Sequence, residues 1–371
     1  MGSYAVLELG GHEIMMGKNH HVWTHQTIFQ DDDLTWISCA KNSDLHRHKR
    51  GYKARLGDLL PRLELMGINL DRVRWSFENP HPSYDEIADV SFERLLEILH
   101  SVDHPFASKQ EGDDLTPDIA SLVFHMGPYE VCRLIGERPD FHDLELVWDF
   151  MDVVEGGWYA ADDFSVGLDA QSKILLITEG TSDINVIRHA LNILRPKIAD
   201  FFTFIDMGKN YPFPGAGDLR KFVEGLNAIG VRNRALAIFD NDSAGVGEMA
   251  DLSKNLLPNL KVTKLPDLDI FRNFPTIGPG GETILDDING RACGIESYLD
   301  LLPDDRIRWG NPARKGGTKQ GAFDRKAAIR KDFMKSKVGD AYDFSKIEAV
   351  LDLIQFECSS FGKGRNPPRQ V

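Results

Sequence analysis

Acidic side chains stand at two points in the second half of the sequence where an apolar run ends, and their types and spacing are those of a metal site. The candidates are Glu179, Asp183, Asp240 and Asp242. Glu179 directly follows the apolar run 173–178, and Asp240 directly follows the run 235–239. Carboxylate oxygens are ligands that Mg²⁺ and Mn²⁺ favour in proteins. Acids that are held together without a cation repel one another, and their pKa values rise. The pattern therefore indicates chemistry assisted by a divalent metal.

The elements that must position these acids alternate between strand and helix patterns from residue 172 onward. Short continuous apolar runs are typical of buried parallel strands, and we expect strands at 173–178, 201–205, 235–239 and 261–265. Helical patterns lie between them, at 182–194, 218–226 and 246–257. Strand–helix repeats with short connections indicate an α/β fold, in which helices flank both faces of a parallel sheet.

The carboxyl ends of parallel strands lie at one edge of their sheet, where ligands usually bind. Glu179 and Asp240 should therefore meet at this edge, although they are far apart in the sequence. Gly180 and Gly245 would let the backbone turn sharply there and would leave room for a phosphate.

Simpler structural roles are open for two of these acids. Asp183 could cap a helix or be stabilised by the positive end of the helix dipole, and Asp242 could stabilise a turn. Glu179, at the end of a buried strand, is harder to explain without a function. Together, at these positions, the acids favour a functional site.

The acidic segments also form two ordered motifs. Glu179-Gly-x-x-Asp183 follows one apolar strand, and Asp240-x-Asp242-x-x-Gly245 follows another. This arrangement, over about residues 172–300, resembles the TOPRIM domain, the catalytic fold of topoisomerases, primases and nucleases of the overcoming-lysogenization-defect (OLD) type. The resemblance implies a Rossmann-like sheet in which Glu179, Asp240 and Asp242 hold metal and act in catalysis. It implies that Asp183 contributes to a metal ion or its water shell.

A further element, Gly294-Ile-Glu-Ser-Tyr-Leu299, resembles the Ile-Glu-x-Tyr element of OLD-like TOPRIM nucleases. The resemblance implies that Glu296 is another metal ligand and that the cofactor is a pair of Mg²⁺ or Mn²⁺ ions. The residues alone leave another interpretation open, since 295–302 also fits an amphipathic helix with an exposed glutamate.

Basic residues gather near the end of the sequence, although the net charge of the chain is −14. Residues 306–337 contain 11 Lys and Arg but only two acids, which leaves −23 on the rest of the chain. Because phosphate attracts positive surface, an acidic body with one basic segment is compatible with an enzyme that acts on a polyanion. A solvated lysine-rich helix would give the same pattern.

Three residues in a glycine-rich loop of this segment are candidate nucleic-acid contacts: Arg314, Lys315 and Lys319. OLD-like enzymes place a catalytic basic residue after the glutamate element, so the resemblance implies that Lys315 or Lys319 stabilises developing charge. The alternative for each is a loop that only steers phosphate or is merely solvated.

The first half of the chain has a different composition and pattern. Eleven of the 12 histidines precede residue 150, which supports a domain boundary near 155–172. Apolar runs on either side of Gly10-Gly11 predict a β-hairpin. Helical spacing behind it predicts a mostly helical α+β domain, with patterns at 56–66, 84–99 and 115–155.

The opening segment, from Met1 to Asn19, resembles the HEPN/TOPRIM-associated N-terminal domain, which precedes a HEPN ribonuclease domain or a TOPRIM domain in bacterial conflict proteins. We therefore expect three parts. They are this N-terminal domain at 1–160, the TOPRIM catalytic core at 172–300, and a basic helical extension of the core at 301–371.

The composition is that of ordinary globular domains, with 42% hydrophobic and 27% charged residues. No apolar run approaches the ~20 residues that span a bilayer, and no signal peptide is recognisable. The four cysteines form no CxxC pair, which argues against zinc fingers and disulfide frameworks and favours a reducing cytoplasm.

The two resemblances imply a metal-dependent nuclease that hydrolyses phosphodiester bonds by a two-metal mechanism and acts in bacterial antiphage defence. Its partner would be nucleic acid, either DNA or RNA, tRNA included; a homo-oligomer or a partner protein of a defence system is compatible with it. The main alternative is a non-catalytic TOPRIM module for nucleic-acid binding or assembly. A phosphatase of the haloacid dehalogenase type, with Asp240 as nucleophile, fits less well because Ala244 departs from that motif and Glu179 stays unexplained.

Overall fold

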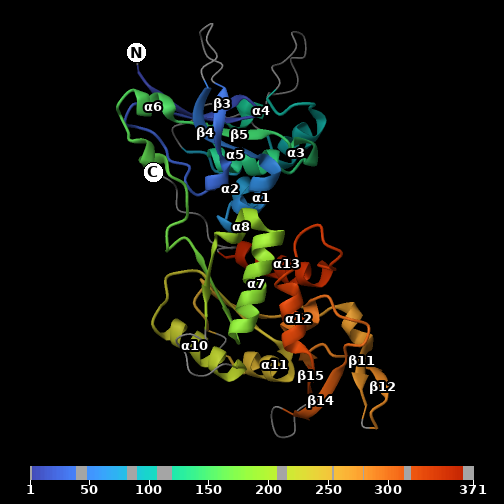
Figure 1. Ribbon diagram of the computed structural model, residues 1–371. Helices are drawn as coiled ribbons and strands as arrows, with labels where there is room; N and C mark the ends of the chain where they lie inside the picture. The colour runs from blue at the N-terminus through green and yellow to red at the C-terminus, as the bar shows by residue number, and fades with distance from the viewer. Residues whose placement is uncertain are drawn as a thin grey trace. The chain divides into compact units, whose positions relative to one another are not determined.

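A computed structural model describes residues 2–38, 48–81, 90–106, 119–206, 215–252, 255–278, 280–312 and 319–361. The chain divides into two compact units at Leu168 and Asp169, and each unit has its own sheets and core (Figure 1). Within the described parts of the chain, no helix is long and apolar enough to cross a membrane.

The first unit is built on a five-stranded antiparallel sheet with the strand order β2-β1-β5-β4-β3. Its strands are β1 (Tyr4–Leu9), β2 (His12–Lys18), β3 (Leu34–Ser38), β4 (His48–Arg55) and β5 (Glu145–Asp149). The predicted hairpin joins β1 to β2. Gly10 and Gly11 form its turn with φ angles of 57° and 78°, a backbone conformation that glycine adopts at little cost.

Helices complete the first unit and cover its apolar core. They are α1 (Leu56–Leu65), α2 (Leu70–Glu78), α3 (Phe92–Ser101), α4 (Ile119–Val123), α5 (Pro128–Ile135) and α6 (Met151–Glu155). Helix α3 buries Phe92, Leu95 and Leu99 on one face, at the predicted helical spacing. The Ser91 hydroxyl caps this helix by accepting a hydrogen bond from the Arg94 N–H.

The sheet of the first unit is larger than the sequence predicts. A single hairpin is expected, whereas three further strands join it, and β5 lies inside the stretch 115–155 that reads as helical. Strand β5 is central, between β1 and β4, and its alternate residues Leu146 and Trp148 are buried. Five residues are too few to distinguish period 2 from helical spacing, so only pairing with distant strands determines this element.

The buried His25 makes the stability of the first unit sensitive to acid. Its Nδ1 lies 2.9 Å from the Tyr129 hydroxyl, and its ring contacts the edge of Trp148. Burial lowers the pKa of His25 to about 4, so between pH 6.5 and 4 the unfolded chain takes up a proton that the folded unit excludes. Stability is therefore complete above pH 6.5 and is lost as the pH falls, by about 3 kcal/mol at pH 4.

Urea unfolding at pH 7 and pH 4.5 checks this prediction, since five of the six tryptophans report on the first unit. We expect the loss of unfolding free energy between these pH values to be smaller in His25→Gln than in wild type. Equal losses in the two proteins would contradict a role for His25.

The second unit contains the predicted parallel sheet, with the strand order β10-β8-β6-β7 and parallel pairing throughout. The strands are β6 (Ile174–Thr178), β7 (Phe202–Ile205), β8 (Ala235–Phe239) and β10 (Leu260–Lys264). All four predicted strands are thus present, and the α/β class is confirmed. The chain passes from β6 to β7 on one side and then crosses back to β8 on the other. This order leaves a topological switch point between β6 and β8, where ligands bind in open α/β sheets.

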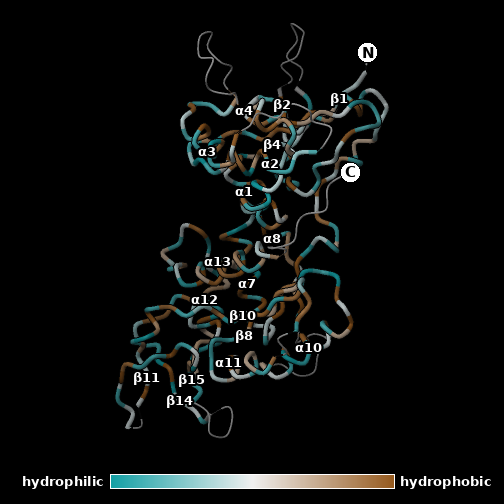
Figure 2. The backbone as a smooth tube through the Cα atoms, turned by 180° about the vertical axis from the view of Figure 1, so that it is seen from behind, coloured by the Kyte–Doolittle hydropathy of each residue, from teal (hydrophilic) through white to brown (hydrophobic). Residues whose placement is uncertain are grey.

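Helices cover both faces of this sheet. They are α7 (Thr181–Leu194), α8 (Pro196–Ala199), α10 (Ala216–Ala228), α11 (Ser243–Ala250) and α13 (Ser345–Ser359). Figure 2 shows the apolar strands of this sheet with α7 and α13 on one side and α10 and α11 on the other. Helix α7 contacts α13, and α10 contacts α11. The α10 and α11 face is packed by residues such as Ile177, Ala237, Phe239, Leu219 and Val223.

Additional strands extend the second unit beyond this sheet. β9 (Asn241–Asp242) pairs with β13 (Ala292–Cys293), and a separate sheet has the order β12-β11-β14-β15. Its strands are β11 (Phe274–Ile277), β12 (Thr283–Asp286), β14 (Ile307–Pro312) and β15 (Lys319–Phe323). Helix α12 (Lys326–Phe333) follows β15.

The part after residue 300, expected to be a basic helical extension, contains two strands as well as helices. β14 and β15 precede α12 and α13, and β14 pairs in parallel with β11 from before residue 300. Both strands are short, and each contains a glycine and a charged residue, which weaken the strand pattern. The alternative interpretation of 295–302 as an amphipathic helix is wrong, since only the 3₁₀ turn Ile295–Tyr298 forms there.

Candidate metal centre

Five carboxylates gather around the switch point between β6 and β8, and we call them the acidic centre. They are Glu179, Asp183, Asp240, Asp242 and Glu296, the same five that the sequence singled out as metal ligands. Glu179 follows β6 and Asp240 follows β8. Since these strands are direct neighbours in the sheet, residues far apart in the sequence lie at one edge.

A direct hydrogen bond joins the two strand ends. The Asp240 N–H donates to Glu179 Oε1 at 2.9 Å, so the Glu179 side chain spans the gap between the ends of β6 and β8. Gly245 makes this approach possible, because a Cβ at that position would overlap the Asp240 carbonyl oxygen and lie 2.8 Å from Glu179 Oε1. Glycine is therefore required here for close packing, and not for the sharp turn that we expected, because Gly245 lies within helix α11 without a positive φ.

Asp242 is oriented by three donors. Its Oδ1 accepts hydrogen bonds from the Ala244 and Gly245 N–H groups at 2.9 and 2.8 Å, as the cap of helix α11. Its Oδ2 accepts a hydrogen bond from Gln320 Nε2 at 2.5 Å. The side chain is nearly buried. The simpler capping role is thus real, and it also fixes the carboxylate in one orientation beside Asp240.

Glu296 enters the acidic centre from a distant segment. The pairing of β9 with β13 brings the turn after Cys293 against Asp242, and Glu296 is only 3% exposed. Arg330 donates to Glu296 Oε1, and the Lys326 ammonium lies 3.8 Å from Oε2. The glutamate is therefore buried and ion-paired with α12, which excludes the exposed position expected of an amphipathic helix.

Gly294 lies against the carboxylates of Asp240 and Glu296. A Cβ at Gly294 would be 3.1 Å from Glu296 Oε2 and 3.5 Å from Asp240 Oδ2. Similarly, a Cβ at Gly180 would be 3.5 Å from Asp183 Oδ2. Glycines thus keep the space in front of several carboxylate oxygens free.

Asp183 takes the helix-start role that the sequence left open. Its Oδ2 accepts a hydrogen bond from the Gly180 N–H at 3.1 Å, at the start of α7. Next to it, the Thr181 hydroxyl donates to Asp206 Oδ1 at 2.6 Å. This contact brings the end of β7 to the same rim.

The acids destabilise one another's charged forms. Burial raises the pKa of Glu179 to about 8, and the charges of Asp242 and Asp183 act in the same direction. Burial and the charge of Glu296 raise the pKa of Asp183 to about 6. Burial also raises the pKa of Asp240 well above its usual value, with further contributions from Asp183 and Glu179. A cation at this place would relieve this repulsion.

The residues present fit a divalent cation in three respects. The donors are carboxylates, glycines leave space in front of them, and the buried Ser243 hydroxyl beside Asp242 has no hydrogen-bond partner among the described residues. In the arrangement described, however, no three His, Cys, Asp or Glu side chains of the described ranges form a ready-made metal site. Protein donors hold Asp242 and Glu296 instead, so those contacts would have to yield to metal.

The predicted basic residues are only partly described. Lys319 is exposed at the first position of β15, whereas Arg314 and Lys315 lie outside the described residues. The cations that do contact the acidic centre, Lys326 and Arg330, were not predicted. Their spacing of four residues on a helix is the signal that could have placed them on one face.

Two polar residues at the centre also escaped the sequence analysis. Asn241 is fully buried, and its side chain bonds Asp267, Lys264 and the Gly290 N–H. It thereby fixes the backbone between Asp240 and Asp242. Gln320 reaches Asp242 because β15 lies against β13, where the Gly321 N–H donates to the Arg291 carbonyl, and nothing in the linear sequence connects the two residues.

A family model matches the N-terminal part of the chain. Residues 1–172 match the family model described as HEPN/Toprim N-terminal domain 1. The match supports the resemblance of this region, and it ends before the first residue of the acidic centre. It hints at a nuclease-associated family. No curated protein and no solved structure matches the chain.

Proposed function

We propose that the second unit is a TOPRIM domain of the OLD-like type, and that the protein is a metal-dependent nuclease. The observation that carries the proposal is the position of Glu179 and Asp240. They face each other across the switch point of a parallel sheet, joined by a 2.9 Å hydrogen bond. The N-terminal match to a family named for its association with Toprim supports the same assignment.

Glu179, Asp240 and Asp242 would hold the metal, with Asp183 and Glu296 at the side of the site. Bound there, Mg²⁺ or Mn²⁺, two ions in this proposal, would activate water and stabilise the charge that develops at the phosphate.

The chain's own residues have three tasks in this proposal. The N–H groups at the start of helix α11 hold Oδ1 of Asp242 in one orientation, which reduces the entropy that metal binding would cost, while Gln320 would release Oδ2 to the metal. Arg330 and Lys326 balance the charge of Glu296. Lys319 or Lys315 would supply a cation to the reacting phosphate, and Arg314 would contact the strand.

The proposed setting follows from the N-terminal match and the composition. We assign the protein to antiphage defence in the cytoplasm, with DNA or RNA, tRNA included, as its substrate. Cys132, Cys293 and Cys358 are buried and unpaired, which suits a reducing compartment. A second copy or a defence protein would supply control.

A non-catalytic nucleic-acid-binding or assembly module is the second candidate. The ion pairs that occupy Glu296 favour it, because they satisfy this buried charge without metal. It predicts that the chain binds nucleic acid yet neither binds metal at the acidic centre nor cuts.

A cleavage panel tests the proposal. Plasmid, single-stranded DNA, total RNA and tRNA are incubated with Mg²⁺, Mn²⁺ or EDTA. We expect wild type to cut at least one polymer only with metal, and Glu179→Ala to reduce the rate by more than about 100-fold, because it removes a metal ligand. The matched control is Asp269→Ala, an exposed acid paired with Arg272 away from the acidic centre.

Cleavage that persists in EDTA or in Glu179→Ala would overturn the metal mechanism. If no polymer is cut, calorimetry with Mg²⁺ and Mn²⁺ decides between the candidates. Metal binding that needs Glu179 supports a latent enzyme, and its absence supports the non-catalytic module.

A further inference from the structure

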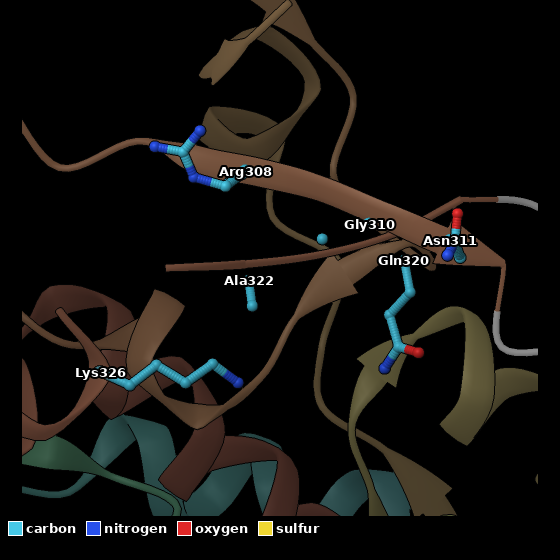
Figure 3. Close-up of a pocket in the computed structure, with 7 residues that line it drawn as sticks. Arg308, Gly310, Asn311, Gln320, Ala322 and Lys326 are labelled. Atoms are coloured by element: carbon cyan, nitrogen blue, oxygen red, sulfur yellow. The ribbon is translucent and has the colours of Figure 1, made fainter. Parts of the chain in front are cut away.

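A shallow depression of about 260 Å³ lies on the β14–β15 pair, beside the start of α12 (Figure 3). Two cations line it, Arg308 and Lys326, together with the side-chain amides of Asn311 and Gln320. Its other lining residues are small, and no acidic side chain is among the described residues that line it. In a chain with a net charge of −14, such a surface is suited to an anion.

A β-bulge shapes this depression. Trp309 pairs with Gly321 and Pro312 pairs with Lys319, so two residues of β14 stand opposite Gln320 alone. Bulges bend a strand and redirect side chains. Here the bulge accompanies a Gln320 side chain that reaches out of the sheet to Asp242.

The depression is in direct contact with the acidic centre. Gln320 donates to Asp242, and the Lys326 ammonium lies 3.8 Å from Glu296 Oε2. Figure 3 shows the Lys326 side chain extending from α12 toward Gln320. A group bound in the depression would therefore lie one side chain away from the carboxylates that the proposed function assigns to metal.

We propose that this depression binds a backbone phosphate of the nucleic-acid strand, next to the phosphate that is cut. The inference rests on the proposed function and adds a substrate contact to it. Lys326 supplies the charge, since its side chain is 42% exposed and has donors free to reach a phosphate while it stays near Glu296. Asn311 and Gln320 add amide donors. Arg308 contributes less, because both oxygens of Asp324 accept from its guanidinium.

The test is binding of labelled single-stranded DNA and RNA oligonucleotides in EDTA, measured by fluorescence anisotropy over a range of salt. We expect Lys326→Gln to weaken both by about tenfold. The salt dependence should fall by about 0.7 in logarithmic slope, as for one lost phosphate contact. The matched control is Lys331→Gln, an exposed lysine of the same helix that does not line the depression. Its affinity should stay within about twofold of wild type.

A second variant separates this role from the ion pair with Glu296. Asn311→Asp has the same shape, is exposed, and adds a negative charge to the lining without touching the acidic centre. It should weaken binding about as much as Lys326→Gln does. If only DNA or only RNA binds more weakly to these variants, that polymer is the one whose phosphate the depression accepts.

The outcome is independent of the cleavage test. Wild-type affinity in both variants, or equal losses in Lys326→Gln and Lys331→Gln, would overturn the phosphate subsite even if metal-dependent cleavage is observed. Conversely, Glu179→Ala should bind the oligonucleotides in EDTA at least as tightly as wild type. A failure of the nuclease proposal would therefore leave a positive binding result intact.

Discussion

Asp240→Asn should abolish the effect of divalent metal on the second unit and should leave the unit folded. Asparagine keeps the shape of the side chain, and the Asp240 backbone N–H that binds Glu179 is retained. It removes one of the charges that burial and the neighbouring acids disfavour, so the metal-free protein should melt no lower than wild type. At a metal concentration 100 times the dissociation constant, wild type should gain about 2.7 kcal/mol of stability. Asp240→Asn should gain almost none.

Thermal unfolding with and without Mg²⁺ or Mn²⁺, together with calorimetry, measures this difference. Asp269→Asn removes an exposed acid outside the acidic centre and should respond to metal like wild type. If Asp240→Asn still gains stability from metal, the ions bind elsewhere, and the assignment of the acidic centre fails.

Gly245→Ala should damage the same centre by steric means. The added methyl group would overlap the Asp240 carbonyl oxygen and lie 2.8 Å from Glu179 Oε1, where only backbone and a half-buried side chain could move. We expect a loss of about 1–3 kcal/mol in unfolding free energy. We also expect metal-dependent stabilisation to fall with it, because Glu179 must leave the Asp240 N–H.

Gly225→Ala is the matched control for this variant. Gly225 lies inside α10, and a Cβ there would have no neighbour within 4 Å. Alanine in an open helical position should raise stability by about 0.5–1 kcal/mol and leave the metal response unchanged. Equal behaviour of Gly245→Ala and Gly225→Ala in calorimetry would show that the close approach of Glu179 and Asp240 does not matter for metal.

The charge balance of the acidic centre explains why these experiments are informative. Glu296 is compensated by Arg330 and Lys326, whereas Glu179 and Asp240 face mainly other acids and one backbone N–H. Metal binding should therefore depend most strongly on Glu179 and Asp240. Glu296 would bind metal only if its ion pairs with Arg330 and Lys326 of α12 were broken.

Much of the second unit could be predicted from the sequence. The central strands β6 and β8 are continuous apolar runs because helices bury both of their faces. The edge strands β7 and β10 are only partly buried and carry polar residues, so their sequence pattern is weaker. Glu179 and Asp240 can be predicted as functional residues from the same pattern, because each directly follows a buried strand. The switch point follows only from the order β10-β8-β6-β7, which no local pattern specifies.

The sequence by itself determined the parallel strands, the hairpin at Gly10-Gly11 and the acids that could share one edge. Each of these depends on neighbours within a few residues. Tertiary structure alone decided that β5 lies at the centre of an antiparallel sheet, that α12 neutralises Glu296, and that Gln320 holds Asp242. The reason is that strand pairing and ion pairing join segments distant in sequence, whose partners are chosen by packing of the whole unit.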